Sequence, residues 1–445
     1  MNILKNLFSN LILILTTNIF LIVSYYQLSI PISILLVVVS LVFYLLTNIS
    51  NFGIDKNLPK SLKTLQKGNN LILSSFILVI VNSFTLIYSN FNLIPPITRA
   101  FWVIQLVVSI LLILGMIINS LFRLYVSSLQ LGIKKRVLFI IFWWIPVVNI
   151  YFWIDVFKTT FSEFKVEKEK FYLNESRKNL EICSTKYPIL LVHGVFFRDS
   201  NYFNYWGRIP KELEKNGAKI FYGDQESAGS IEDCGKQVAK RINEIVEQTG
   251  CEKVNIIAHS KGGLDSRYAI SNCGVASKVA TLTTINTPHY GCDYVDYLFE
   301  KVPSKIINKI AKTYNFTLKK VGDKNPDFIT AITNLTKSYI EEFNKSNPNS
   351  SDVYYQSFGS IIEKLKKDKR KKFPLNLSFL FIKFFNKSND GLVSLDSMKW
   401  NNFTFVDETG LSHADMIDLF RENIDDFDIR EFYVKLVSDL KESEY

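Results

Sequence analysis

The sequence predicts a chain of two parts: an all-α transmembrane bundle, followed by an α/β domain whose mostly parallel sheet is flanked by helices. Three observations support this prediction. Hydrophobic residues make up 48% of the 445 residues, and the long uncharged runs among them all lie in the first 157. Most of the excess positive charge lies in the same segment. From about residue 187 onward, short apolar runs alternate with stretches of helical periodicity, as in βαβ units.

Five stretches in the first 157 residues are nearly free of charge and, at about 20 residues each, are long enough to cross a bilayer as helices. They are residues 7–26, 29–47, 71–89, 101–122 and 137–154. Pro146 and Asn149 interrupt the last stretch, so a re-entrant or interfacial segment is the alternative there. The first stretch is longer than the apolar part of a usual signal peptide and no Ala-x-Ala site follows it, which predicts an uncleaved anchor.

Residues 1–157 contain ten Lys or Arg against two Asp, and so carry +8 of the net charge of +10. The basic residues group after the second and fourth stretches: Lys56, Lys60, Lys63 and Lys67, then Arg123, Lys134, Lys135 and Arg136. This pattern indicates membrane orientation, and no nucleic-acid partner is expected. With five spans, the positive-inside rule makes the protein a multi-pass protein of the cell membrane whose α/β domain is extracellular. Without the fifth span, the α/β domain would lie on the cytoplasmic side of the membrane.

The cysteines all lie in the second part: Cys183, Cys234, Cys251, Cys273 and Cys292. An odd number cannot pair fully within the chain, so a disulfide scaffold is not expected. Free thiols are typical of the cytoplasm, which argues against the extracellular placement.

Residues 158–186 carry alternating charges and predict a charged linker or solvated helix before the α/β domain of residues 187–445. The predicted strands are 187–194, 219–223, 253–257, 279–286 and the run DVYYQSFGS, and the predicted helices are 230–250 and 260–272. A capping box at Ser230 begins the first of these helices. Helix-like pieces in residues 292–345 interrupt the alternation and predict an inserted lid.

The run KVNIIAHSKGGLDSRY, residues 253–268, places Ser260 between a strand and a helix, with Ala258 and Gly262 two positions away on either side. A serine on a sharp, strained strand-to-helix turn needs small residues at both positions. Such a turn presents the hydroxyl above the sheet and places the Lys261 N–H at a helix start, where it can donate to a developing oxyanion. The alternative is a Gly-rich turn with a solvated serine.

A second oxyanion donor is expected from the loop after the first strand, residues 190–197. Gly194 in that loop allows the backbone to approach closely. The sequence therefore predicts the Val195 N–H as the partner of the Lys261 N–H.

An activated serine needs a base held by an acid, and in sheet hydrolases the acid and then the histidine follow the serine along the chain. The histidines are His193, His259, His289 and His413. The first three flank turns near strand ends, where a structural role is expected. His413 lies far downstream, and we assign it as the general base and acid.

Asp390 is the predicted acid because it follows the apolar run FLFIKFF and precedes a glycine, as at the carboxyl end of a strand. Asp396 and Asp407 remain as alternatives. A surface Asp-Gly turn is the other reading of Asp390.

Residues 187 to about 439 resemble the bacterial triacylglycerol lipases of the α/β-hydrolase fold. The resemblance rests on motifs in the family's order: YPILLVHG, YWGRIPKELEKNGAKI, KVNIIAHSKGGLDSRYA, TTINTPHYG, and NDGLV followed by SHADMIDL. Ala258 departs from the glycine of many members. The resemblance does not extend to residues 1–157.

The resemblance implies hydrolysis of long-chain carboxylic esters through an acyl-enzyme, with no cofactor required for the chemistry. The implied roles are Ser260 as nucleophile, Asp390 as acid, His413 as base, and the backbone of Val195 and Lys261 as oxyanion hole. It also implies a movable lid at residues 292–345.

Some relatives bind structural Ca²⁺ near the triad histidine, and Asp415 matches one ligand position, with Asp352 as a guess for a second. The alternative reading of Asp415 is a helix-cap carboxylate. The zinc sites of other relatives need further histidines, which this chain lacks.

The sequence therefore predicts a membrane-anchored serine lipase or esterase acting on acylglycerols, with lipid esters and the membrane as its partners. A phospholipase, or a lipid deacylase or acyltransferase acting on membrane lipids, is one alternative. An inactive hydrolase-like membrane scaffold is another. The apolar stretches contain no charged residue apart from Asp155 at an edge, which argues against a transport path.

Overall fold

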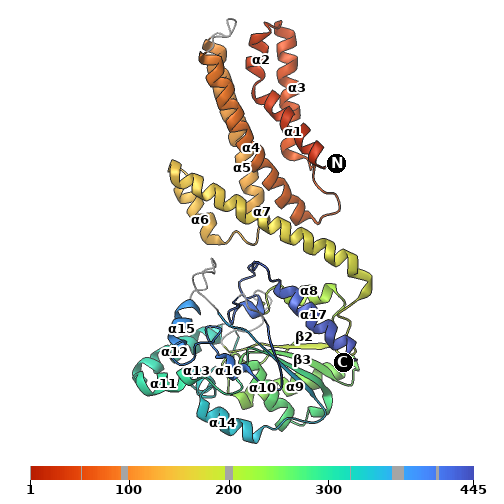
Figure 1. Ribbon diagram of the computed structural model, residues 1–445, viewed down its shortest axis with the longest axis vertical. Coiled ribbons are helices and arrows are strands. Elements are labelled where there is room, and N and C mark those ends of the chain that lie inside the picture. The colour runs from red at the N-terminus through yellow and green to blue at the C-terminus, as the bar shows by residue number, and fades with distance from the viewer. Residues whose placement is uncertain are drawn as a thin grey trace. The chain divides into compact units, whose positions relative to one another are not determined.

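The computed structural model of the chain describes residues 2–51, 53–91, 99–195, 204–320, 322–362, 375–406 and 410–445. The chain divides into two compact units, Met1–Glu175 and Ser176–Tyr445 (Figure 1). Helix α7, Pro146–Arg177, runs without interruption through the first part of the predicted linker. Most of the charged stretch 158–186 is therefore the continuation of a helix that begins in the first unit.

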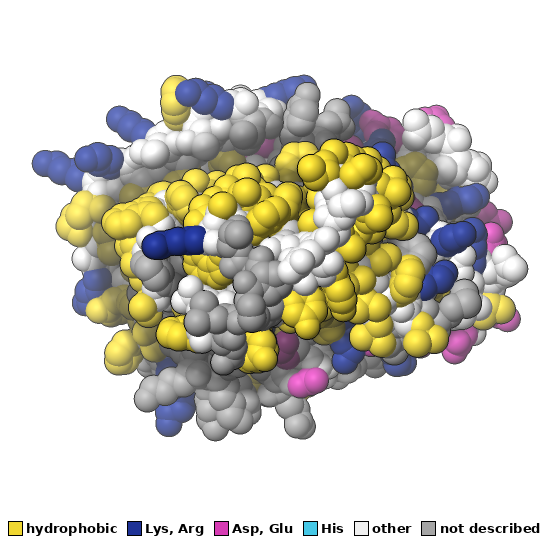
Figure 2. Space-filling model, turned by 90° about the horizontal axis from the view of Figure 1, so that it is seen from above, with side chains coloured by type: hydrophobic (Ala, Val, Ile, Leu, Met, Phe, Trp, Pro, Cys, Tyr) yellow, Lys and Arg dark blue, Asp and Glu magenta, His cyan; other side chains and the backbone are white. Residues whose placement is uncertain are grey.

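The first unit is built from helices. They are α1 Asn2–Thr17, α2 Ile19–Tyr25, α3 Ile30–Ile49, α4 Lys60–Phe91, α5 Arg99–Ser127, α6 Ile133–Phe142 and α7. By length and composition α3, α4 and α5 could each cross a membrane, and the pair α1–α2, bent by 61°, could form a fourth span. Hydrophobic side chains gather at the centre of the view in Figure 2.

The predicted fifth span, residues 137–154, is not one helix. Helix α6 ends at Phe142 and α7 begins at Pro146. Proline has no backbone N–H and its ring fixes φ, so it starts a helix more readily than it continues one. Against the five spans expected from the sequence, three helices in the described residues, or four with the bent pair, are long and apolar enough to cross a membrane.

Polar side chains tie the helices of the first unit together. The Asn82 amide donates to the Thr17 hydroxyl at 3.0 Å, and the Gln105 amide donates to the Thr17 carbonyl at the break between α1 and α2. In an apolar environment such interhelical hydrogen bonds hold helices in register.

The second unit contains one parallel sheet with strand order β2-β1-β3-β4-β5-β6. Its strands are β1 Ile189–Val192, β2 Ile220–Tyr222, β3 Val254–His259, β4 Val279–Ile285, β5 Tyr354–Gly359 and β6 Asn402–Phe405. The five predicted strands are confirmed as β1 to β5. Two corrections remain: β6 was not predicted, and the run FLFIKFF belongs largely to a helix, α15 Leu375–Ile382.

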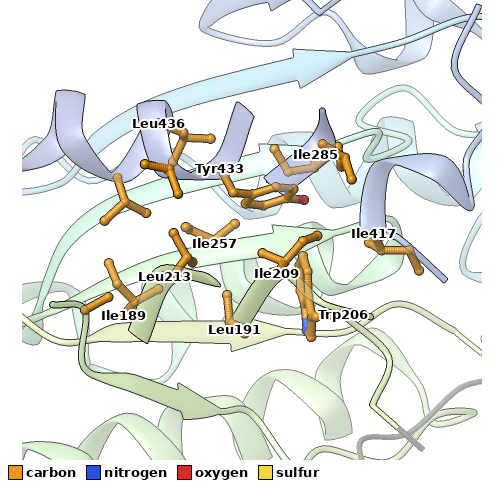
Figure 3. Packing of buried hydrophobic residues seen from close by; sticks show 14 of the residues in the cluster. Ile189, Leu191, Trp206, Ile209, Leu213, Ile257, Ile285, Ile417, Tyr433 and Leu436 are labelled. Carbon is orange, nitrogen blue, oxygen red and sulfur yellow. The ribbon is translucent and has the colours of Figure 1, made fainter. Parts of the chain in front are cut away.

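Side chains alternate across the sheet, so that each face has its own core. Ile189, Leu191 and Ile257 pack on one face with residues of α8 Ile209–Lys215 and α17 Ile429–Glu442, including Tyr433 (Figure 3). Leu190, Val192 and Ile256 pack on the other face with α9 Ile231–Thr249 and α10 Lys261–Asn272. Each fully buried Leu or Ile contributes about 1.5–3 kcal/mol, so the two faces fix the sheet between helical layers. The sheet and its flanking helices confirm the predicted α/β-hydrolase fold class.

The remaining elements are short or lie in the insertion between β4 and β5. The insertion is helical, as predicted for residues 292–345, with α11 Asp293–Lys301, α12 Ser304–Lys320, α13 Phe328–Thr333 and α14 Lys337–Ser346. Outside it lie α16 Leu395–Met398 and the 3₁₀ turns Lys178–Leu180, Ala276–Lys278 and Asp415–Ile417. The predicted cap of α9 is confirmed, because the Ser230 hydroxyl accepts from the Asp233 N–H at 3.0 Å.

Candidate active site

Ser260 occupies a strained turn between β3 and α10. Its backbone has φ 56° and ψ −133°, a region that residues with a side chain avoid. The sharp reversal brings α10 against the end of β1, and a Cβ at Gly262 would lie 2.3 Å from the His193 carbonyl oxygen. A Cβ at Gly194 would lie 2.8 Å from the Ser260 Cβ. The contacts around the serine therefore leave no room for a side chain at Gly262 or Gly194.

Asp390 and His413 are joined by a hydrogen bond of 2.6 Å between the Asp390 Oδ2 and the His413 Nδ1. The carboxylate is fully buried and its Oδ1 accepts from the N–H groups of Leu392 and Val393 at 2.8 and 2.7 Å. The Asn286 amide donates to Oδ2 at 2.6 Å. These hydrogen bonds fix the orientation of the carboxylate toward the imidazole.

The setting of Asp390 differs from the expected strand end. It lies in a tight turn that is closed by a bridge between Asn389 and Ser394 and contains Gly391 at φ 97°. Of the two alternative acids, Asp396 is exposed and pairs with Lys399 at 2.9 Å, and Asp407 lies outside the described residues.

The Ser260 hydroxyl and the His413 Nε2 form no hydrogen bond within the described part of the chain. Both residues lie at the same end of the sheet. The Ser260 N–H donates to Ile285 at the end of β4, and the imidazole of His413 lies 4.4 Å, centroid to centroid, from that of His259, the residue before the serine. In unliganded enzymes the hydrogen bond from nucleophile to base is often long and shortens when substrate binds.

The predicted oxyanion donors are the backbone N–H groups of Lys261 and Val195. Lys261 is the first residue of α10, where N–H groups have no partner inside the helix and the helix dipole is positive. Val195 follows Gly194, the residue in close contact with the Ser260 side chain. Neither N–H donates a hydrogen bond to any described residue. The rest of the predicted oxyanion loop, from residue 196, lies outside the described residues.

A buried ion pair below the serine was not anticipated from the sequence. The Lys261 ammonium donates to the Asp265 carboxylate at 2.6 Å, and both side chains are at most 3% exposed. Burial raises the pKa of Asp265 to about 6, although the lysine charge opposes the rise. The Lys-x-x-x-Asp spacing places both groups on one helix face, but in a sequence it reads as an ordinary surface pair.

The three histidines predicted to be structural are fully buried. His193 contacts the carbonyls of Gly194 and Gln225, and His289 stacks on Trp400 at 4.3 Å. The His259 Nδ1 is 2.7 Å from the Tyr205 hydroxyl. Burial, followed by the nearby His413, holds the pKa of His259 well below 6.5.

The contacts of Asp415 agree with the alternative reading of this residue as a capping carboxylate. One carboxylate oxygen of Asp415, Oδ2, accepts from both the N–H and the hydroxyl of Ser412, as in a capping role. Asp352 is exposed at the turn before β5. Among the described residues, no group of three or more His, Cys, Asp or Glu could hold a metal ion.

Comparison with known proteins relates the chain to lipid-ester hydrolases. The family described as Palmitoyl protein thioesterase matches residues 188–351. A triacylglycerol lipase of Pseudarthrobacter phenanthrenivorans is 29% identical over 181 residues, which cover 38% of this chain and 56% of that protein. Triacylglycerol lipase 2 of Saccharomyces cerevisiae is 29% identical over 270 residues, 54% of this chain and 76% of that protein.

This chain spans 56% and 50% of the lengths of the triacylglycerol lipases of P. phenanthrenivorans and Burkholderia plantarii. Among solved structures, Staphylococcus hyicus lipase aligns with a TM-score of 0.46 at 17% identity, over 58% of this chain and 97% of that one. Bacillus licheniformis lipase BlEst2 in its mature form aligns with a TM-score of 0.41 at 22% identity, over 53% and 88%. The α/β part of the chain is thus similar in sequence to triacylglycerol lipases.

Proposed function

We propose that the protein is a membrane-anchored serine hydrolase that cleaves carboxylic esters of acylglycerols. The observation that supports this most directly is the combination of the strained Ser260 turn with the hydrogen-bonded pair Asp390–His413. Strain of this kind costs about 1–3 kcal/mol and persists where a function requires it.

The proposed reaction has two steps. The Ser260 oxygen attacks the ester carbonyl carbon while its proton passes to the His413 Nε2, and the N–H groups of Val195 and Lys261 donate to the oxyanion. His413 then gives the proton to the departing alcohol, leaving an acyl-serine. His413 then takes a proton from water, and the resulting hydroxide attacks the acyl-serine. The fatty acid leaves, and His413 returns the proton to the Ser260 oxygen. Asp390 orients the imidazole and stabilises its protonated form.

The helical insertion supports a lipid substrate. Helix α12 exposes Ile306, Ile310, Tyr314 and Phe316, each at least 43% exposed, while its buried Leu318 packs with Ala228 and Ala331 beside Val195. An apolar surface of this kind next to a candidate site fits contact with acyl chains or a lipid surface. We assign the insertion as the lid of the site.

Hydrolysis of p-nitrophenyl esters of graded chain length, by wild type and Ser260→Ala, tests the proposal. We expect activity to be retained on long acyl chains in wild type and lost in the variant. A fluorophosphonate probe should label only wild type. Equal activity in both proteins would exclude Ser260 as the nucleophile, and absence of labelling would favour the inactive scaffold.

Thioester hydrolysis is a second candidate, favoured by the match to the palmitoyl protein thioesterase family over residues 188–351. The same serine chemistry cleaves both bond types. Comparing kcat/KM on a palmitoyl thioester and on the matching oxygen ester separates the two. Products from phospholipid against triglyceride distinguish a phospholipase from a triacylglycerol lipase.

We further propose that the α/β unit faces the cytoplasm. The extracellular placement depended on a fifth span, and residues 137–154 are divided between two helices. With α1–α2, α3, α4 and α5 as four spans, the basic segments after the second and fourth spans lie on the same side as the α/β unit. The positive-inside rule makes that side cytoplasmic, where five free cysteines are expected.

A further inference from the structure

Lys67 of α4 is a buried cation with a single hydrogen-bond acceptor among the described residues. Its side chain is 4% exposed, and its ammonium donates at 2.5 Å to the Thr47 carbonyl in the last turn of α3. That carbonyl lies at the negative end of the α3 dipole, which offsets only part of a full charge. An ammonium has three N–H donors, so two remain for other acceptors.

No described carboxylate pairs with Lys67. Asp155 is bound to Lys135 at 2.9 Å. Glu163 accepts from the Leu129 N–H at 2.7 Å and from Ser128, and Asp55 accepts from Asn57 and Tyr172. A buried ammonium without a counter-charge is costly, so an anion from outside the chain would stabilise this arrangement.

A cavity of about 60 Å³ adjoins Lys67 between α1, α3 and α4. Apart from Lys67, its lining includes Asn6, Ser9, Asn10 and Asn70, and none of its described lining residues is acidic. The Asn10 Oδ1 accepts from the Ser74 hydroxyl at 2.6 Å, which leaves the Asn10 amide N–H₂ as the end available to a ligand. Several donors around one cation suit an anion with several acceptor oxygens.

The position of Lys67 along α4 indicates the source of the anion. The apolar stretch of α4 begins at Leu71, and the 18 residues from there span about 27 Å, close to the thickness of the hydrocarbon layer. Lys67 lies one turn before that stretch, at the depth where the phosphate groups of the nearest leaflet lie.

We propose that this cavity binds the phosphate group of a membrane phospholipid, with Lys67 and the Asn10 and Asn70 amides donating to its oxygens. The site lies in the first unit and uses no residue of the candidate active site. This proposal is therefore tested independently of the ester-hydrolase proposal. Free inorganic phosphate shares the same chemistry, and the experiment below separates the two sources.

Native mass spectrometry of the detergent-purified full chain tests the proposal. The probes are ether-linked phosphatidylglycerol, which no esterase cleaves at its chains, the matching dialkylglycerol without phosphate, and inorganic phosphate. We expect phosphatidylglycerol to bind more tightly than dialkylglycerol. Lys67→Met should weaken phosphatidylglycerol binding about tenfold, as for loss of one charge-assisted hydrogen bond, and leave dialkylglycerol binding unchanged. Lys63→Met, one turn away on the same helix, is the matched control and should bind like wild type.

Asn70→Ala provides a second test if Lys67→Met fails to fold, because it keeps the Lys67–Thr47 contact and removes only a donor from the cavity. It should also weaken phosphatidylglycerol binding. Unchanged binding in a monodisperse Lys67→Met protein, or equal binding of phosphatidylglycerol and dialkylglycerol, would overturn the proposal and leave Lys67 as a cap of α3. If inorganic phosphate binds through Lys67 but phosphatidylglycerol does not, the anion is not the phosphate group of a lipid.

Discussion

At the scale of single residues, the candidate site depends on a serine that is held in a strained conformation by its neighbours. Gly262 and Gly194 approach so closely to His193 and to Ser260 itself that a methyl group at either position would meet atoms at 2.8 Å or less. The Ser260 N–H is also fixed by its hydrogen bond to Ile285. The packing of two strand ends against α10 therefore offsets the energetic cost of the strained Ser260 backbone.

Asp390→Asn should lower kcat on a p-nitrophenyl ester by about 10³–10⁴-fold with a smaller change in KM. The amide cannot stabilise the imidazolium, and it favours the wrong tautomer of His413. Asp396→Asn is the matched control, because Asp396 is exposed and pairs only with neighbours on the surface; its kcat should stay that of wild type. A large loss in Asp396→Asn with none in Asp390→Asn would reassign the acid.

The buried histidines predict how stability depends on pH. Burial and the nearby His413 lower the pKa of His259, and burial and Arg267 lower that of His289. Both are neutral when folded and take up protons when unfolded below pH 6.5, so stability is retained above that pH and lost as the pH falls through it. The loss should reach about 1.4 kcal/mol per pH unit for each histidine. Urea unfolding between pH 7.5 and 5 measures it, and a His259→Gln variant with an unchanged slope would contradict it.

At the scale of elements, α10 combines two tasks. Its first residue, Lys261, carries a backbone N–H without a partner inside the helix, and the side chain of the same residue pairs with Asp265, one helical turn along. A buried ion pair of this kind stabilises the fold little more than apolar residues would. Removing one partner strongly destabilises the fold, because the remaining charge is left without a partner. The pair therefore fixes the first turn of the helix that carries the proposed oxyanion donor.

Lys261→Met alone and Asp265→Leu alone should each destabilise the protein by about 3–5 kcal/mol. The double variant should lose much less than the sum of the two, since no unpaired charge is left. Chemical denaturation of the four proteins gives the coupling free energy. Strictly additive losses would mean that the two side chains do not act as a pair in solution.

The elements also explain how far the sequence alone could lead. Apolar runs bounded by turns predict β1 to β5, α9 and α10. The spacing around Ser260 and the chain order of acid and base predict Asp390 and His413, which the structure places in contact. The run FLFIKFF is apolar at nearly every position, so it has no periodicity to separate helix from strand. The sequence therefore predicts a strand end where the structure has α15. β6 is short and largely exposed, and Lys261–Asp265 is recognised only once α10 is known to be buried.

At the scale of the whole molecule, the basic residues link the membrane part to the orientation of the candidate enzyme. The chain has two units, and the excess charge belongs to the first. Since each span reverses the side, the number of spans decides on which side of the membrane the α/β unit lies. The break between α6 and α7 at Pro146 therefore bears on which side of the membrane the α/β unit occupies.

A membrane-impermeant maleimide distinguishes the two orientations. Cys251 and Cys273 are the cysteines of the α/β unit with partly exposed side chains, whereas Cys183, Cys234 and Cys292 are buried. With four spans we expect no labelling of intact cells and strong labelling after permeabilisation, because the reagent must cross the membrane to reach the unit. The variant Cys251→Ser/Cys273→Ser should lose the signal in permeabilised cells, which shows that the label reports these two sites. Labelling of intact cells that this variant abolishes would instead require an odd number of spans, and residues 137–154 would then cross the membrane despite the break at Pro146.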